Sequence, residues 1–177
     1  MASPTIGILT SDRGPGDPER ASLMGEAGRL LARKGVEMVC LAEQGVVPVP
    51  LISAARTAGG TVTVLADASI VLPAALAAVP ISVVPDRAER MAQLAKVDVL
   101  VGLPGSLASA TALFGAWAAG QGVPVVMLNR HRAFEAMRGF AADVLAHSVS
   151  GHDRKVQFAD SVDDLWNKIS WLLAQRK

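Results

Sequence analysis

The segment "LPGSLAS" places small and hydroxyl-bearing residues where a predicted strand gives way to a helix. Gly105 lets the backbone approach a ligand closely, and the start of the helix offers N–H groups that bind anions. The hydroxyls of Ser106 and Ser109 can donate to phosphate oxygens. Together with Pro104, these residues predict a phosphate-binding loop. The alternative is that Ser106 only caps the helix.

A second candidate loop, "TSDRGPGD", begins at Thr10 after the first predicted strand. Thr10, Ser11 and Arg13 are residue types that bind ribose or phosphate, and Gly14 favours a turn. The spacing departs from the dinucleotide-binding pattern GxGxxG, because Glu19 stands where the third glycine belongs. We expect these four residues, from Thr10 to Gly14, to contact the ligand; the alternative is a plain turn.

Other polar residues follow predicted strands or open a helix. Asn129 comes directly after an apolar strand and is a candidate ligand contact. Weak candidates for catalysis are Glu43, which follows the second strand, and the two arginines Arg87 and Arg90 of "DRAER". Charged runs of this kind are more often solvated helix faces.

The composition excludes several classes of protein. The formal net charge is +1, which gives no broad electrostatic footprint for nucleic acid or an anionic membrane. Cys40 is the only cysteine, so there is no internal disulfide and no thiolate metal cluster; it is expected to be a buried apolar residue. The three histidines lack the spacing of metal ligands. No metal site is predicted.

Residues 99–129 contain no charged side chain and are long enough to cross a bilayer. Pro104 and Gly105 interrupt the run early, and Gly120, Gly122 and Pro124 interrupt it again. A strand, a helix and a second strand fit better than a membrane span. The start of the chain lacks the pattern of a signal peptide, so a cytoplasmic location is expected.

Strands and helices alternate along the whole chain, without an internal repeat or a linker. This order predicts one domain, residues 1–177, with a doubly wound parallel sheet of six or seven strands. Predicted strands cover residues 5–10, 36–42, 61–66, 81–84, 97–103, 125–128 and 155–158. Predicted helices cover residues 18–34 (with Asp17 as cap), 51–58, 86–96, 106–121 and 132–147, and a last helix follows Ser161. In such a sheet a ligand binds at the carboxyl ends of the strands, where the strand order reverses.

Segments from most of the chain, among them "SDRGPGDPERASLMGEAGRLLARKGVEMVC", "VDVLVGLPGS", "GVPVVMLN" and "RAFEAMRGFAADVLAHSVSGHDRKVQFADSVDDLWNKI", resemble the LOG family. These Rossmann-like nucleotide-binding proteins have long been labelled possible lysine decarboxylases. The resemblance implies hydrolysis of cytokinin nucleoside 5′-monophosphates to the free base and ribose phosphate. The family's hallmark is Pro-Gly-Gly-x-Gly-Thr-x-x-Glu.

The hallmark is degenerate in this chain. Residues 104–112 read "PGSLASATA", so Ala112 occupies the place of the catalytic glutamate and two glycines are missing. The glycine-rich segment expected after the second strand is replaced by "CLAEQG". Because the reaction needs an acid to activate water, the resemblance implies a binding protein for a phosphorylated small molecule, above all a nucleotide, without the hydrolase activity. No cofactor is expected beyond such a nucleotide or phosphate.

Three alternatives stay open. Glu43 could supply the missing carboxylate in a nucleoside monophosphate phosphoribohydrolase with relocated acids. A molybdenum-cofactor carrier has a related fold, although its relatives keep a glycine-rich loop. A DNA-processing protein resembles "GSLASATA" but needs a basic surface, which this chain lacks.

The helix over residues 106–121 predicts a homodimer. One stripe carries Leu107, Ala110, Phe114 and Ala118, and the other carries Ala112, Leu113, Ala116 and Trp117. A helix that covers a sheet needs one apolar stripe. The stripe with the tryptophan is therefore expected to pack against a second copy.

Overall fold

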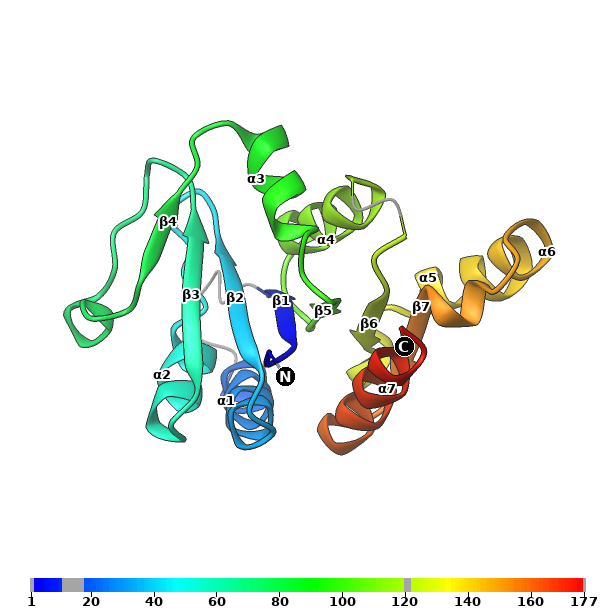
Figure 1. Cartoon of the computed structure of the whole chain (residues 1–177), viewed down its shortest axis with the longest axis horizontal. Coiled ribbons are helices and arrows are strands. Elements are labelled where there is room, and N and C mark those ends of the chain that lie inside the picture. Colours follow the sequence, from blue (N-terminus) through cyan, green and yellow to red (C-terminus); the bar gives the residue numbers. More distant parts are fainter. Residues whose placement is uncertain (1, 11–17, 120–121, 177) are drawn as a thin grey trace.

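Seven parallel strands form the centre of the molecule in the order β4-β3-β2-β1-β5-β6-β7 (Figure 1). The structure is a computed structural model, and it describes residues 2–10, 18–119 and 122–176. The strands are β1 (Thr5–Leu9), β2 (Glu37–Ala42), β3 (Thr61–Ala66), β4 (Ile81–Val83), β5 (Val99–Gly102), β6 (Val125–Leu128) and β7 (Val156–Ala159). This confirms the predicted doubly wound sheet. The strand order reverses between β1 and β5.

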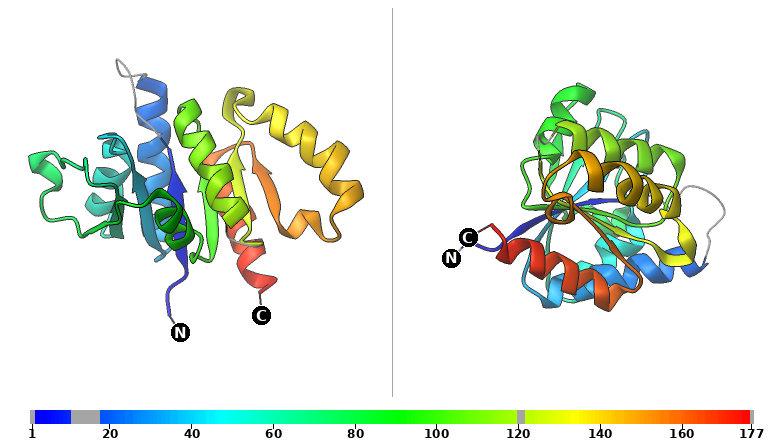
Figure 2. Two further views of the ribbon diagram at one scale, coloured as in Figure 1. Left: turned by 90° about the horizontal axis from the view of Figure 1, so that it is seen from above. Right: turned by 90° about the vertical axis from the view of Figure 1, so that its right-hand side faces the viewer.

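Helices cover both faces of the sheet (Figure 2). One face carries α1 (Pro18–Arg33), α2 (Val49–Thr57) and α7 (Val162–Ala174), and the other carries α3 (Arg87–Leu94), α4 (Leu107–Ala119) and α5 (Glu135–Phe140). Each layer encloses its own apolar core. The central strands are buried on both sides, which explains why they are continuous apolar runs rather than alternating ones.

Local chemistry sets the ends of several helices. Asp86 caps α3 by accepting the N–H of Glu89 at 2.8 Å, and Ser161 caps α7 by accepting the N–H of Asp164 at 3.1 Å. A glycine also decides how closely α1 and α2 pack. A Cβ at Gly28 would lie 2.4 Å from the carbonyl oxygen of Leu51, so only glycine permits this contact. The predicted cap Asp17 lies outside the described residues.

The helix predicted over residues 132–147 forms, but it begins three residues later, at Glu135, and contains a π-helical turn. A 3-10 turn (Arg130–Arg132) follows β6, and then come α5, a π-helical turn (Ala141–Leu145) and the short α6 (Ala146–Ser148). His131 and Arg132 have positive φ angles of 53° and 61°, which interrupt helical geometry. The Asn129 side chain accepts the N–H of Phe134 at 2.7 Å, so the helix begins after that residue.

The assignment of the two stripes of α4 is also wrong. Ala112, Leu113 and Ala116 are at most 1% exposed and pack on the sheet, and Trp117 is half-buried against the same core. Leu107, from the other stripe, is 85% exposed. The sequence pattern could not predict which stripe packs on the sheet, because both stripes are apolar and the outcome depends on how α4 docks. Among the described residues, no helix is long and apolar enough to span a bilayer.

Candidate functional site

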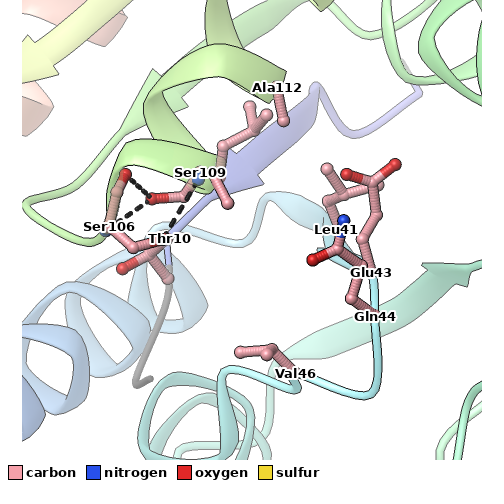
Figure 3. A pocket seen from close by; sticks show the side chains of 10 residues that line it. Thr10, Leu41, Glu43, Gln44, Val46, Ser106, Ser109 and Ala112 are labelled. Carbon is pink, nitrogen blue, oxygen red and sulfur yellow. Dashed lines mark hydrogen bonds between the residues drawn. The ribbon is translucent and has the colours of Figure 1, made fainter. Parts of the chain in front are cut away.

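A narrow cleft lies at the carboxyl edge of the sheet, beside the point where the strand order reverses. Three parts of the chain build it: the end of β1, the end of β2 with the turn after it, and the first turns of α4 (Figure 3). Its lining residues are Leu9, Thr10, Leu41, Glu43, Gln44, Val46, Ser106, Ala108, Ser109 and Ala112. This is where a doubly wound sheet is expected to bind a ligand.

Ser106 and Ser109 form a reciprocal cap at the start of α4. The N–H of Ser109 donates to Oγ of Ser106 at 3.2 Å, and the N–H of Ser106 donates to Oγ of Ser109 at 2.9 Å. The hydroxyl of Ser109 also donates to the carbonyl oxygen of Ser106 at 2.9 Å. The serines therefore stabilise the helix start and line the cleft at the same time.

The candidates from the first loop are only partly described. Thr10 is 5% exposed, and its hydroxyl donates to the carbonyl oxygen of Pro104 at 3.4 Å, which links the end of β1 to the loop after β5. Ser11, Arg13 and Gly14 lie outside the described residues.

Glu43 lies on the wall that faces Ser109 and Ala112 (Figure 3). Its Oε1 accepts two hydrogen bonds from Arg90, from Nε at 3.0 Å and from Nη2 at 2.5 Å. The Arg90 side chain is 4% exposed, and its Nη1 donates to the carbonyl oxygens of Val84 at 2.5 Å and Pro85 at 3.2 Å. The guanidinium of Arg90 thus donates its hydrogen bonds to other groups of the protein, and Arg90 influences the cleft only through its contact with Glu43.

Arg87 stays exposed at the start of α3, with its Nε 3.7 Å from Oε1 of Glu43. The structure therefore brings the three weak catalytic candidates together, although Glu43 and Arg90 are 47 residues apart in the sequence.

Asn129, the remaining candidate after a strand, does not lie at this cleft. It is buried, donates to Glu135 at 2.7 Å and caps the segment before α5.

Asp67 supports the turn that carries Glu43 and was missed from the sequence. It follows β3 directly, and its Oδ2 accepts the N–H of Gln44 at 2.8 Å. Its Oδ1 accepts the N–H and the hydroxyl of Ser69, at 3.0 and 2.5 Å. The hydrogen bonds from Gln44 and Ser69 hold the pKa of Asp67 below its ordinary value. An acid directly after a strand was the available clue.

Backbone geometry explains why the turn needs this support. Gln44 has a φ angle of 54° and Gly45 one of 73°, and Glu43 pairs with Val46 in a short antiparallel bridge. A left-handed conformation is unfavourable for a residue with a Cβ. The hydrogen bond from the N–H of Gln44 to Asp67 offsets part of that cost.

The cleft is small, and its lining residues are half apolar and half polar. Within it, the centre of a water molecule can move through about 40 Å³, which corresponds to a few water molecules. A ligand can insert one flat or compact group and must extend outward with the rest. Glu43 is the only charged residue among the described lining residues. A wider hollow of about 570 Å³ between α1 and α2 is lined by those helices rather than by strand ends.

No metal site was expected, and Asp160, Asp163 and Asp164 fit the beginning of a helix better. Asp163 and Asp164 lie in the first turn of α7, where acids complement the helix dipole. Across residues 2–10, 18–119 and 122–176, no three His, Cys, Asp or Glu side chains are grouped so that they could hold a metal ion.

No family model matches the sequence, and neither does any curated protein. Solved structures do share the fold. The Moco carrier protein of Chlamydomonas reinhardtii has a TM-score of 0.74 at 20% identity, over 98% of this chain and 99% of that one. The molybdenum cofactor binding protein of Rippkaea orientalis has a TM-score of 0.71 at 17% identity, with the same coverage. The X-ray structure of TM1055 has a TM-score of 0.67 at 23% identity, over 95% of this chain and 99% of that one.

These likenesses establish the Rossmann-like fold; the LOG motif is not confirmed by them. They do contradict the expectation of no cofactor, because two of the neighbours are described as carrying or binding the molybdenum cofactor. The physical reason is that backbone amides and hydroxyls at strand ends can hold a phosphorylated cofactor without a distinctive motif. The sequence of such a site therefore contains no motif from which the cofactor could be predicted.

Proposed function

We propose that the chain is a LOG-like binding protein for a phosphorylated small molecule, which it holds in the cleft without cleaving it. The observation that carries the proposal is the joining of the β1 end, the β2 turn and the capped start of α4 around one cleft. The first turn of a helix leaves backbone N–H groups unpaired and favours negative charge. The phosphate is therefore proposed to lie at Ser106, and the organic part between the apolar walls.

The lack of hydrolysis is proposed from Ala112. In the LOG motif this position carries the glutamate, whereas here a methyl group with 1% exposure packs against the sheet. Removing the group that activates water lowers the rate of a hydrolase by orders of magnitude.

The molybdenum cofactor, a phosphorylated pterin, is one ligand of the proposed class, and the structural neighbours favour it. The cleft offers hydroxyls at one end for the phosphate of this cofactor, and apolar side chains that can contact one edge of its flat ring. Because no metal-binding group of side chains converges in the described part of the chain, recognition is proposed to go through the pterin and the phosphate. AMP and GMP represent the nucleotide alternative.

Ser106 provides a sharp test. Ser106→Asp keeps an oxygen that caps the helix but adds a negative charge beside the proposed phosphate, and Ser106→Asn is the neutral control of nearly equal size. In wild type, a bound ligand should raise Tm with the logarithm of its concentration. We expect AMP, GMP, inorganic phosphate or the isolated cofactor to raise the Tm of wild type and of the Asn variant, and not that of the Asp variant. Equal shifts in all three proteins would place the phosphate elsewhere.

A second candidate function follows from the position of Glu43 across the cleft from Ala112. In a phosphoribohydrolase with relocated acids, this carboxylate would activate the water. Release of free base from AMP, abolished by Glu43→Gln in a protein that stays folded, would favour this reading over the binding protein. We expect no release.

A further inference from the structure

The two carboxylate oxygens of Glu43 have different surroundings. Within the described residues, every contact that Arg90 and Arg87 make with Glu43 goes to its Oε1. No side-chain nitrogen or oxygen in that part of the chain is both buried and unpaired. Oε2 takes part in none of these contacts and is therefore not buried, and because Glu43 lines the cleft, Oε2 is the oxygen left to accept a hydrogen bond from a ligand there.

The direction of Oε2 is fixed by the protein. Arg90 donates two hydrogen bonds to Oε1, and it also donates to the carbonyl oxygens of Val84 and Pro85, which fix its own position. Asp67 holds the backbone of the turn through Gln44. A hydrogen-bond acceptor that is oriented before the ligand arrives loses little conformational entropy on binding.

The rest of the cleft limits what can approach Oε2. Half of the lining residues are apolar: Leu9, Leu41, Val46, Ala108 and Ala112. The open space between the walls is small, so a thin planar group enters it more easily than a bulky one. A carboxylate oxygen accepts N–H groups and repels a second phosphate.

We propose that Glu43 determines the specificity of the site: its Oε2 accepts a hydrogen bond from an N–H group on the edge of a planar heterocycle. The preferred ligands are then ring compounds of the guanine or pterin type, which carry a ring N–H beside an exocyclic amine. This inference rests on the proposed function, because it needs a ligand whose phosphate lies at the start of α4.

Two nucleotides test the inference on the unaltered protein. GMP and purine riboside 5′-monophosphate share the ribose phosphate, but only GMP has N–H donors on its base. A hydrogen bond to a charged group changes affinity by about tenfold or more. We expect wild type to bind GMP at least tenfold more tightly by titration calorimetry.

Glu43→Gln extends the test. Arg90 needs an acceptor, so the amide oxygen of the glutamine should face Arg90 and its NH₂ group should face the cleft. The variant replaces an acceptor by a donor, and it should bind GMP at least tenfold more weakly while its affinity for purine riboside 5′-monophosphate changes less than threefold. A thermal melt of the variant checks that it remains folded.

The outcomes separate the two proposals. If wild type binds both nucleotides equally, or if a folded Glu43→Gln protein keeps the preference for GMP, the specificity role of Glu43 is wrong and the phosphate site stands. If inorganic phosphate binds and neither nucleotide does, the ring does not enter this cleft and the inference fails. If wild type binds none of these three probes, nor AMP, nor the isolated cofactor, the proposed function fails, and this inference fails with it.

Discussion

Truncation of Glu43 to alanine should destabilise the fold, independently of any ligand. The change removes the carboxylate that accepts two hydrogen bonds from Arg90, a guanidinium with a side-chain exposure of 4%. Only the bonds to the carbonyl oxygens of Val84 and Pro85 would remain. A buried charge that loses its counter-ion retains its full cost of desolvation.

The expected size follows from burial. Removing one partner of a buried ion pair lowers the free energy of unfolding by about 3 to 5 kcal/mol. Glu43 lies at the edge of a cleft with 16% exposure of its side chain, so water can enter the space and hydrate Arg90 in part. We therefore expect a loss of about 2 to 3 kcal/mol in the free energy of unfolding. For a chain of this length that lowers Tm by about 4 to 12 °C.

Urea and thermal unfolding measure this loss. Glu89→Ala is the matched control, because Glu89 is an exposed glutamate in the same region, whose side chain accepts only a long 3.5 Å hydrogen bond from Gln93; we expect a loss below about 0.5 kcal/mol. In the double variant Glu43→Ala, Arg90→Met the buried charge is gone, so its loss should be smaller than the sum of the single losses. If Glu43→Ala is as stable as Glu89→Ala, or if the losses add, the pairing argument is refuted.

Three further predictions concern other parts of the chain. Asp67→Asn should lower Tm at pH 7. The difference in Tm from wild type should close as the pH falls below 3.8, because the stability that comes from a lowered carboxyl pKa is lost when the group is protonated in the folded state. Curves of Tm against pH that run parallel for the two proteins would contradict this. Burial raises the pKa of Cys40 to about 12, so a thiol reagent at pH 8 should leave the native protein unmodified and label it after unfolding, and rapid labelling of the native protein would contradict this. The homodimer stays a prediction, now based on the exposed apolar Leu107; sedimentation should give a dimer at micromolar concentration that Leu107→Lys dissociates, and a stable wild-type monomer would refute it.

Local patterns predicted the sheet well because burial, caps and glycines agree along this chain. Residues 61–66 and 125–128 form strands with the predicted bounds. The helix after β6 begins three residues later than predicted, because a turn rather than the apolar pattern sets its start. There, the side chain of Asn129 and two residues with positive φ set the start of α5, and no periodicity reports on such a turn.

The candidate site was predicted in part, for a related reason. Strand ends and helix starts can be placed from the sequence, so Thr10, Ser106 and Ser109 were named and do line one cleft. The pairing of Glu43 with Arg90 depends on how α3 docks over the end of β2, which is a tertiary contact. Asn129 illustrates the converse, since its position after a strand suggested a ligand and the structure uses it as a local cap.

Capping and ligand binding by the two serines need not exclude one another. The hydroxyl hydrogen of Ser109 is used, since it donates to the carbonyl oxygen of Ser106. Oγ of Ser106 takes part in the cap only as an acceptor, from the N–H of Ser109, so its own hydrogen can still donate. A phosphate at this helix start would then draw one hydroxyl hydrogen bond, from Ser106, while Ser109 keeps that serine in place. With Ser106 and Ala108 at the positions where the LOG motif has glycines, the chain lacks a loop that wraps the phosphate and retains one oriented donor at a helix terminus.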